Sequence, residues 1–145
     1  MVLISLFFSA FLAATLFPAQ SELLFAYMVS THAAPSVILL CIAGTGNTLG
    51  SCVNWYLGKK IRFFKDKPWF PASSKRLEQA ENLYQKYGRW SLLLSWMPII
   101  GDPITVIAGV LNERFKIFVL LVSLAKFGRY SIIWVGLIAA QATVS

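Results

Sequence analysis

Charged residues are scarce in this chain of 145 residues, and their scarcity excludes an ordinary soluble domain. Only 13% of the residues are charged and 57% are apolar, whereas charged residues make up about 25% of a typical soluble domain. The mean hydropathy is +0.66. This composition is typical of a membrane protein rather than of a soluble protein of the same length.

Histidine and cysteine are nearly absent, which removes most kinds of catalytic and metal site. The chain has one histidine and two cysteines. Cys41 and Cys52 form no CxxC or other ligand-spaced pair, and His32 lies in a short polar turn. No nucleophile and base are recognisably paired. We therefore expect no enzymatic activity, no metal site and no cofactor.

Acidic residues are also few, since only six occur, and two of them lie within apolar sequence. Glu22 follows Pro18 by four positions, and Asp102 follows Pro98 by the same interval. A carboxylate at membrane depth costs about 2.5–3.5 kcal/mol on insertion scales, so it is usually kept for a proton, ion or substrate task. Glu22 and Asp102 are therefore candidates for proton coupling or transport.

Four apolar stretches are long enough to enter a bilayer, and they fall into two kinds. Residues 35–57 and 115–142 predict spanning helices, because about 20 apolar residues cross the hydrocarbon. Residues 1–29 lack a basic leading region, so we expect them to be retained rather than cleaved. Residues 1–29 and 90–111 are interrupted near the middle by proline, which breaks helices.

The interrupted stretches predict re-entrant hairpins with the two acids near their tips. Arms of about 12–16 residues reach only about 18–24 Å, which is short of a hydrocarbon core of about 30 Å. Pro18 interrupts the first stretch, and Pro98 and Pro103 are the expected breakers of the second.

Basic residues are concentrated in one segment, because nine of the thirteen lysines and arginines lie between Lys59 and Arg89. This clustering predicts a cytoplasmic connector rather than a nucleic-acid surface. Residues 59–71 also carry aromatic side chains and are expected in the headgroup layer. Arg114 and Lys116 mark the 111–116 turn for the same side.

A helix is predicted after the basic aromatic segment, from a cap at Ser73 or Ser74 to a stop at Gly88. Its apolar side chains recur at helical spacing, so we expect an amphipathic surface helix. The predicted apolar face consists of Leu77, Ala80, Tyr84 and Tyr87.

The two halves of the chain repeat one plan, a hairpin followed by a spanning helix with a patch of glycine and polar residues. The predicted fold is an all-α integral membrane domain, with a first repeat at 1–58, a connector at 59–88 and a second repeat at 89–145. The two spanning helices must run in opposite directions, which indicates an inverted-topology repeat. In the first patch Asn47 is a candidate for lining a polar pathway, with ordinary helix packing as the alternative.

Two basic residues lie within the last apolar stretch and need neutralisation there. Lys126 and Arg129 are three positions apart, and Asp102 is their expected partner. Glu22 has no cation in its own half, which favours it as the titrating group. Lys126 and Arg129 are also candidates for binding an anionic headgroup, together with backbone amides at broken helix ends.

Short motifs along nearly the whole chain resemble a known family. They are Phe17-Pro18-Ala19-Gln20-Ser21-Glu22-Leu23-Leu24, Gly46-Asn47-Thr48-Leu49-Gly50, Lys86-Tyr87-Gly88, Leu92-Leu93-Leu94-Ser95-Trp96-Met97-Pro98, Gly101-Asp102, Ala108-Gly109 and Lys126-Phe127-Gly128-Arg129-Tyr130. Together they resemble the bacterial DedA membrane proteins, also called SNARE-associated or VTT-domain proteins, and in particular the YqaA-like branch.

The resemblance implies a multi-pass protein of the bacterial inner membrane with two re-entrant hairpins. Members of the family are implicated in moving undecaprenyl phosphate or phospholipids and in membrane homeostasis, often with a link to the proton motive force. The better-studied branch usually carries Gly-Arg-Phe and a further arginine in the second hairpin. This chain has Ser95-Trp96 and Gly101-Asp102 at those places, so Lys126 and Arg129 are the candidates to supply the positive charge.

These observations predict a transporter or flippase-like protein that handles a lipid phosphate or phospholipid, with protons as the candidate coupling ion. The expected partners are membrane lipids and protons and no nucleic acid, and a homo-oligomer is left open. One alternative is a membrane scaffold or assembly factor that transports nothing. The other is a proton-coupled exporter of small cations, which also needs a membrane carboxylate.

Overall fold

Helices make up all the regular structure in the part of the chain that is described. The structure is a computed structural model that describes residues 1–13, 20–60, 74–97 and 100–144. The elements are α1 (Val2–Ala13), α2 (Gln20–Ser30), α3 (Ser36–Lys59), α5 (Ser74–Tyr87), the 3-10 helix η1 (Gly88–Trp96), α6 (Gly101–Val110) and α7 (Phe115–Val144). The prediction of an all-α fold is thus confirmed for these residues.

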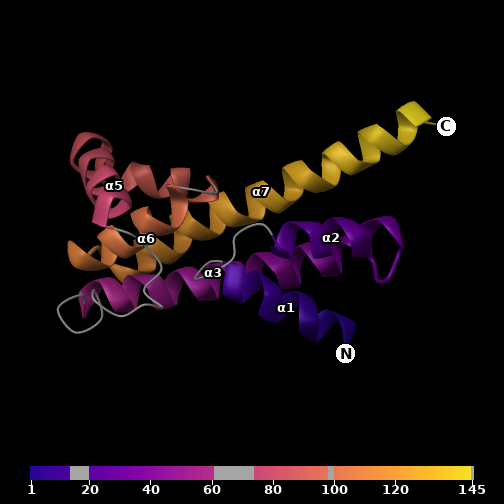
Figure 1. The fold of residues 1–145 in the computed structure, drawn as a ribbon, viewed down its shortest axis with the longest axis horizontal. Helices are drawn as coiled ribbons and strands as arrows, with labels where there is room; N and C mark the ends of the chain where they lie inside the picture. Colours follow the sequence, from indigo (N-terminus) through magenta and orange to yellow (C-terminus); the bar gives the residue numbers. More distant parts are fainter. Residues whose placement is uncertain (14–19, 61–73, 98–99, 145) are drawn as a thin grey trace.

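Two long helices, α3 and α7, form the frame of the molecule. They have 24 and 30 residues and are apolar enough to cross a membrane. At a rise of 1.5 Å per residue they are about 36 and 45 Å long, more than the hydrocarbon thickness of about 30 Å. They lie side by side and run in opposite directions along the long axis (Figure 1). A helix long and apolar enough to span a membrane is therefore present at each of the two predicted places.

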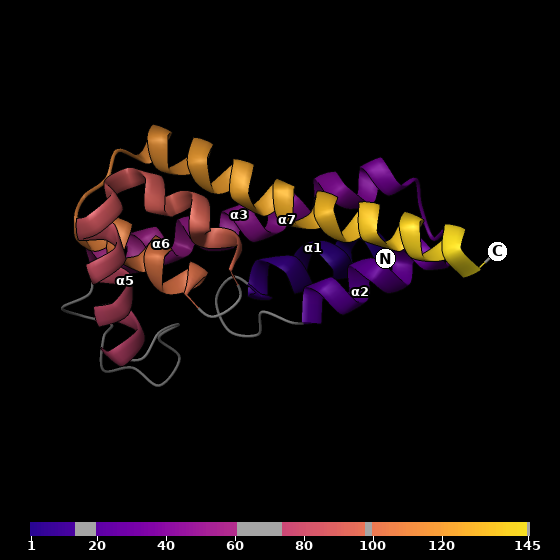
Figure 2. The ribbon, with the colours of Figure 1, turned by 90° about the horizontal axis from the view of Figure 1, so that it is seen from above.

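Two short hairpins pack against opposite ends of this frame. The α1–α2 hairpin lies beside the half of α3 that follows its N-terminus, and α6 lies beside the other half (Figures 1 and 2), with η1 packed against α6 and α7. The four arms have 12, 11, 9 and 10 residues. None of them is long enough to span alone as an α-helix.

The second hairpin differs from its prediction in two respects. Its first arm, η1, is a 3-10 helix. Pro103 does not break the chain but lies in the first turn of α6, where a missing backbone N–H costs nothing. The predicted breaks at Pro18 and Pro98 lie outside the described residues.

Helix α5 is amphipathic as predicted, with one error in its apolar face. Ala80 and Tyr84 are buried, and Leu77 packs beside them. Tyr87 is half exposed, and Leu83 occupies the inner face in its place. Gly88, at a φ of +63°, ends the helix in the left-handed conformation that glycine adopts most easily.

Close backbone contacts fix both hairpins to α3. An added Cβ at Gly58 would collide with the carbonyl oxygen of Val106 in α6, and one at Gly109 with that of Trp55 in α3. Near the middle of α3, a Cβ on Gly46 would lie 2.5 Å from the carbonyl oxygen of Phe7 in α1. Small residues allow such approach, on which helix packing in membranes depends.

Glu113, in the turn between α6 and α7, ties this turn to α5 and η1. Tyr84 donates a hydrogen bond to its carboxylate, and the Arg89 guanidinium lies 3.7 Å from it. Trp55 of α3 donates to the Glu113 carbonyl oxygen at 3.2 Å. Burial, and then the hydrogen bond to Glu113, raise the pKa of Tyr84, which keeps the phenol protonated as the donor. The 111–116 turn therefore lies at the same end as α5.

The close contact at Gly58 leads to a stability prediction. Gly58→Ala should lower the free energy of unfolding by about 1–3 kcal/mol, because the new methyl group overpacks the α3–α6 interface. Gly136→Ala is the matched control, since an added Cβ there meets nothing within 4 Å. Unfolding in mixed detergent micelles measures both variants. Equal stability of the two would show that the α3–α6 contact is looser than described.

Candidate functional site

One turn of α7, residues 126–130, reaches both hairpins. It carries Lys126, Arg129 and Tyr130, and each of these side chains contacts a residue in the first turn of a hairpin helix. Glu22 lies in the first turn of α2, and Asp102 lies in the first turn of α6. Each acid thus lies in the first turn of the second helix of its hairpin.

Lys126 pairs with Asp102 of the second hairpin, as predicted. Its Nζ lies 3.3 Å from Asp102 Oδ1, and its side chain is only 1% exposed. Thr105 donates to the Asp102 carbonyl oxygen at 2.6 Å and accepts from Asn54 of α3 at 3.2 Å. The ion pair thus joins α7 to α6, and Thr105 joins the same turn of α6 to α3.

Arg129 pairs with Glu22 of the first hairpin, which corrects the sequence-based assignment. The sequence suggested Asp102 as the partner of both cations and left Glu22 without one. The guanidinium of Arg129 instead forms an ion pair with the Glu22 carboxylate, from the other half of the chain. The two side chains are 12% and 30% exposed, so this pair is more accessible than the first.

Tyr130 adds a second side chain of α7 in contact with the first hairpin, which the sequence did not single out. Its hydroxyl lies 2.8 Å from Ser21 Oγ, and its ring meets Phe25 edge-on at 5.2 Å between centroids. Ser21 and Tyr130 are both buried. The only sequence signal for this contact was the position of Ser21 beside Glu22.

Asn47 is buried in the interface between α3 and α1. Its Nδ2 donates to the carbonyl oxygen of Ala10 at 2.8 Å. Among the described residues its Oδ1 has no hydrogen-bond partner, and neither has the hydroxyl of Thr48. The hydrogen bond to Ala10 fits the alternative that Asn47 serves helix packing. A role for Asn47 in a polar pathway stays a prediction.

A groove on the side of the molecule exposes the Arg129–Glu22 pair. Its volume is about 270 Å³, and it is lined by Glu22, Trp96, Arg129, Ile132 and Ile133. An adjoining groove of about 230 Å³ shares Trp96, Arg129 and Ile132 with it. Arg129 therefore stands between two apolar grooves beside the end of η1, whereas Lys126 lines neither.

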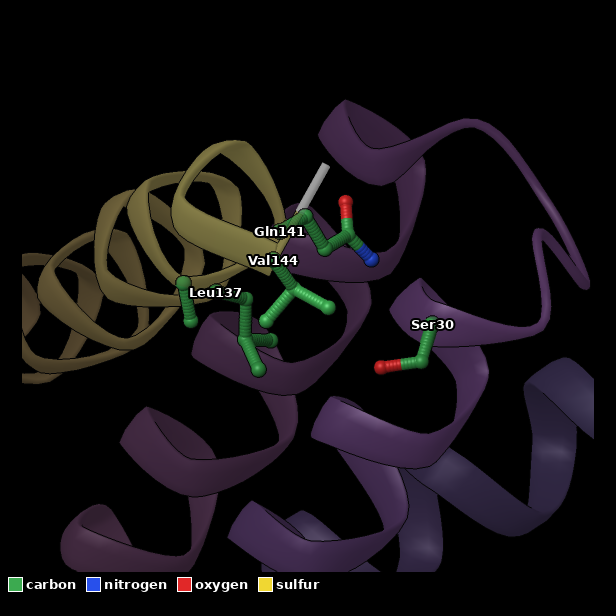
Figure 3. A pocket seen from close by; sticks show the side chains of 5 residues that line it. Ser30, Leu137, Gln141 and Val144 are labelled. Carbon is green, nitrogen blue, oxygen red and sulfur yellow. The ribbon is translucent and has the colours of Figure 1, made fainter.

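A hollow of about 480 Å³ lies at the far end of α7 and carries no charged side chain. Figure 3 shows Leu137 and Val144 of α7 on one side of it and Ser30 of α2 on the other. Within the described ranges, no three His, Cys, Asp or Glu side chains gather in a group that could hold a metal ion. The groove at Arg129 is therefore the candidate site.

Comparison with known proteins shows which sequences this chain resembles. The model of the VTT domain matches residues 17–139. The chain is 34% identical over 128 residues to the inner membrane protein YqaA of Escherichia coli K12, covering 88% of this chain and 85% of the relative. An uncharacterized protein of Haemophilus influenzae is 35% identical over 132 residues, covering 86% of this chain and 80% of that protein. No solved structure matches the chain significantly.

The assignment of the two ion pairs can be tested by double-mutant cycles. Asp102→Asn or Lys126→Met alone should cost about 3–5 kcal/mol of stability, because each leaves a buried charge without its partner. The double variant should recover part of this loss, with a coupling of about 0.5–3 kcal/mol in unfolding measurements. Asp102→Asn combined with Arg129→Gln is the control and should be additive. Coupling in the control but not in the Lys126 pair would reverse the assignment.

Proposed function

Because the chain belongs to the VTT-domain (DedA) family and is a protein of the bacterial inner membrane, we propose that it moves a lipid phosphate or phospholipid between leaflets. It acts as a transporter rather than an enzyme, and its role is in membrane homeostasis. Its partners in this proposal are membrane lipids and protons.

The observation that carries the proposal is an arginine held between two apolar grooves. A guanidinium binds phosphate oxygens through two parallel hydrogen bonds. Trp96 and Ile132 line both grooves beside it, and they offer apolar surface to the chains of a lipid. An arginine in such surroundings fits a molecule with an anionic head and apolar tails.

The position of Trp96 supports the same assignment. It stands in the second hairpin where the better-studied branch of the family carries arginine, and Arg129 of α7 lies beside it. Arg129 can therefore supply from α7 the charge that the hairpin lacks. Lys126 is enclosed with Asp102, which supports a structural role for Lys126 rather than headgroup binding.

Glu22 is the group that exchanges with the substrate in this mechanism. An arriving phosphate competes with the Glu22 carboxylate for Arg129. The displaced carboxylate, left without its cation in an apolar setting, takes up a proton. Loss of that proton restores the ion pair and releases the lipid, which couples transport to a pH gradient.

The two hairpins are proposed to re-enter the membrane from opposite sides, as halves of an inverted repeat. Support comes from their short arms, their places at opposite ends of α3 and α7, and the equivalent positions of Glu22 and Asp102. In this arrangement the binding turn of α7 lies near the midplane, where many transporters built from inverted repeats bind their substrates.

The ion pairs also bear on the two alternative functions, a scaffold that transports nothing and an exporter of small cations. A scaffold whose charges only fix the hairpins is favoured by the enclosed pair of Lys126 and Asp102, but it leaves the groove at Arg129 without a role. A small-cation exporter needs a carboxylate free to bind the cation. Glu22 and Asp102 each face a basic side chain, which argues against it.

Lipid translocation in proteoliposomes tests the proposal, with fluorescent phosphatidylglycerol and fluorescent polyprenyl phosphate as probes. Arg129→Gln should slow translocation about tenfold or more, because a hydrogen bond to a charged group contributes about 1.5–3 kcal/mol. Glu22→Gln should abolish the response to a pH gradient. Lys116→Gln, at an exposed position near the start of α7, is the matched control and should behave like the native protein.

Each negative outcome has a distinct meaning. Failure of the native protein to move either probe under any gradient would refute transport and favour the scaffold. An equal gradient response in the native protein and in Glu22→Gln would remove Glu22 from the coupling step. Native rates in Arg129→Gln would show that the headgroup binds elsewhere.

A further inference from the structure

A separate groove lies between α5 and η1 and shares no lining residue with the two grooves beside Arg129. Its volume is about 490 Å³, within the range of about 300–1,000 Å³ that is usual for ligand pockets. It is lined chiefly by Leu83 and Tyr87 of α5, Trp90 and Leu94 of η1, and Met97 and Ile100 beyond η1. Ser91 also borders it, but its hydroxyl already donates to the Gly88 carbonyl oxygen at 2.7 Å. The groove therefore offers an almost wholly apolar surface.

The rim of this groove is aromatic and carries a cation. Tyr87 and Trp90 are 50% and 65% exposed. Lys86 Nζ lies 5.3 Å from the centre of the Tyr87 ring. Aromatic rings prefer the boundary between headgroups and hydrocarbon, where a lysine attracts anionic lipid. The apolar floor and the charged rim thus match the two parts of one lipid molecule.

We propose that the groove binds one acyl chain of an anionic phospholipid whose headgroup lies against Lys86. Met97 lines this groove, and its neighbour in the sequence, Trp96, lines both grooves beside Arg129. The lipid that we propose as the substrate first binds in this groove, and it enters from the leaflet that α5 contacts. The inference rests on that function for its purpose, but binding can be measured without transport.

Photolabelling tests the groove in the full-length protein. The protein is placed in phosphatidylcholine vesicles with phosphatidylglycerol that carries a diazirine in one acyl chain, and adducts are mapped by mass spectrometry. Labelling should saturate at the side chains that line this groove alone, Leu83, Tyr87, Trp90, Leu94 and Met97. Unlabelled phosphatidylglycerol should compete about fivefold better than phosphatidylcholine, the effect of about one lysine at an anionic surface. Labelling of Leu120 and Val135 of α7, which are exposed and line neither groove beside Arg129, should show neither saturation nor preference.

Two variants separate the parts of the site. Lys86→Gln, at an exposed position, should remove the preference for phosphatidylglycerol and leave the acyl chain bound. Leu94→Trp should fill the groove and reduce its labelling severalfold, with circular dichroism to check folding. If Leu94→Trp does not fold, the comparison of Lys86→Gln with the native protein still tests whether the headgroup lies against Lys86.

Absent or unsaturable labelling of the groove would overturn the inference, and so would an unchanged preference in Lys86→Gln. Saturable labelling in a protein that translocates no lipid would refute the proposed function, but lipid binding in the groove would stand. Translocation without saturable labelling of the groove would refute lipid binding in the groove and leave the proposed function intact.

Discussion

The structure depends on how it neutralises charge in apolar surroundings. Lys126 and Arg129 lie within one long apolar helix, and each would be costly there without a counter-charge. Each pairs with the acid in the first turn of a different hairpin helix, Asp102 of α6 and Glu22 of α2. One turn of α7 therefore holds both hairpins. Its two pairs differ in exposure, since Lys126 is enclosed while Arg129 and Glu22 border a groove. The first pair is suited to holding the fold and the second to exchanging its partner.

Helix packing works together with these pairs. The short hairpin arms must be covered by the long helices, and α3 approaches both hairpins closely, at Gly46 toward α1 and at Gly58 toward α6. Asn47 and Asn54 add one hydrogen bond to each hairpin from the same helix. Helix α3 thus fixes the hairpins by close packing, whereas α7 fixes them by charge. A pair that opens to admit an anionic headgroup does so within a frame that α3 keeps in place.

The sequence predicted the helices better than the contacts between them. The length of each apolar stretch was sufficient to predict α3 and α7, because a membrane sets the length that a spanning helix needs. The pairing of Arg129 could not be derived in this way. Residues three apart on a helix point about 60° from one another, so Lys126 and Arg129 can share a face and still reach different hairpins. The 3-10 form of η1 escaped prediction because its apolar residues have no distinctive period. That Leu83 rather than Tyr87 faces the core depends on how α6 and η1 pack against α5, which the sequence of α5 does not contain.

Hydrogen exchange, measured peptide by peptide in detergent or vesicles, tests most directly whether one turn of α7 holds both hairpins separately. Arg129→Met should speed exchange in α2 and leave α6 as in the native protein, because only the Glu22 pair is lost. Lys126→Met should do the reverse, through Asp102. The same pattern of faster exchange in both variants, or no change in either hairpin, would contradict the account.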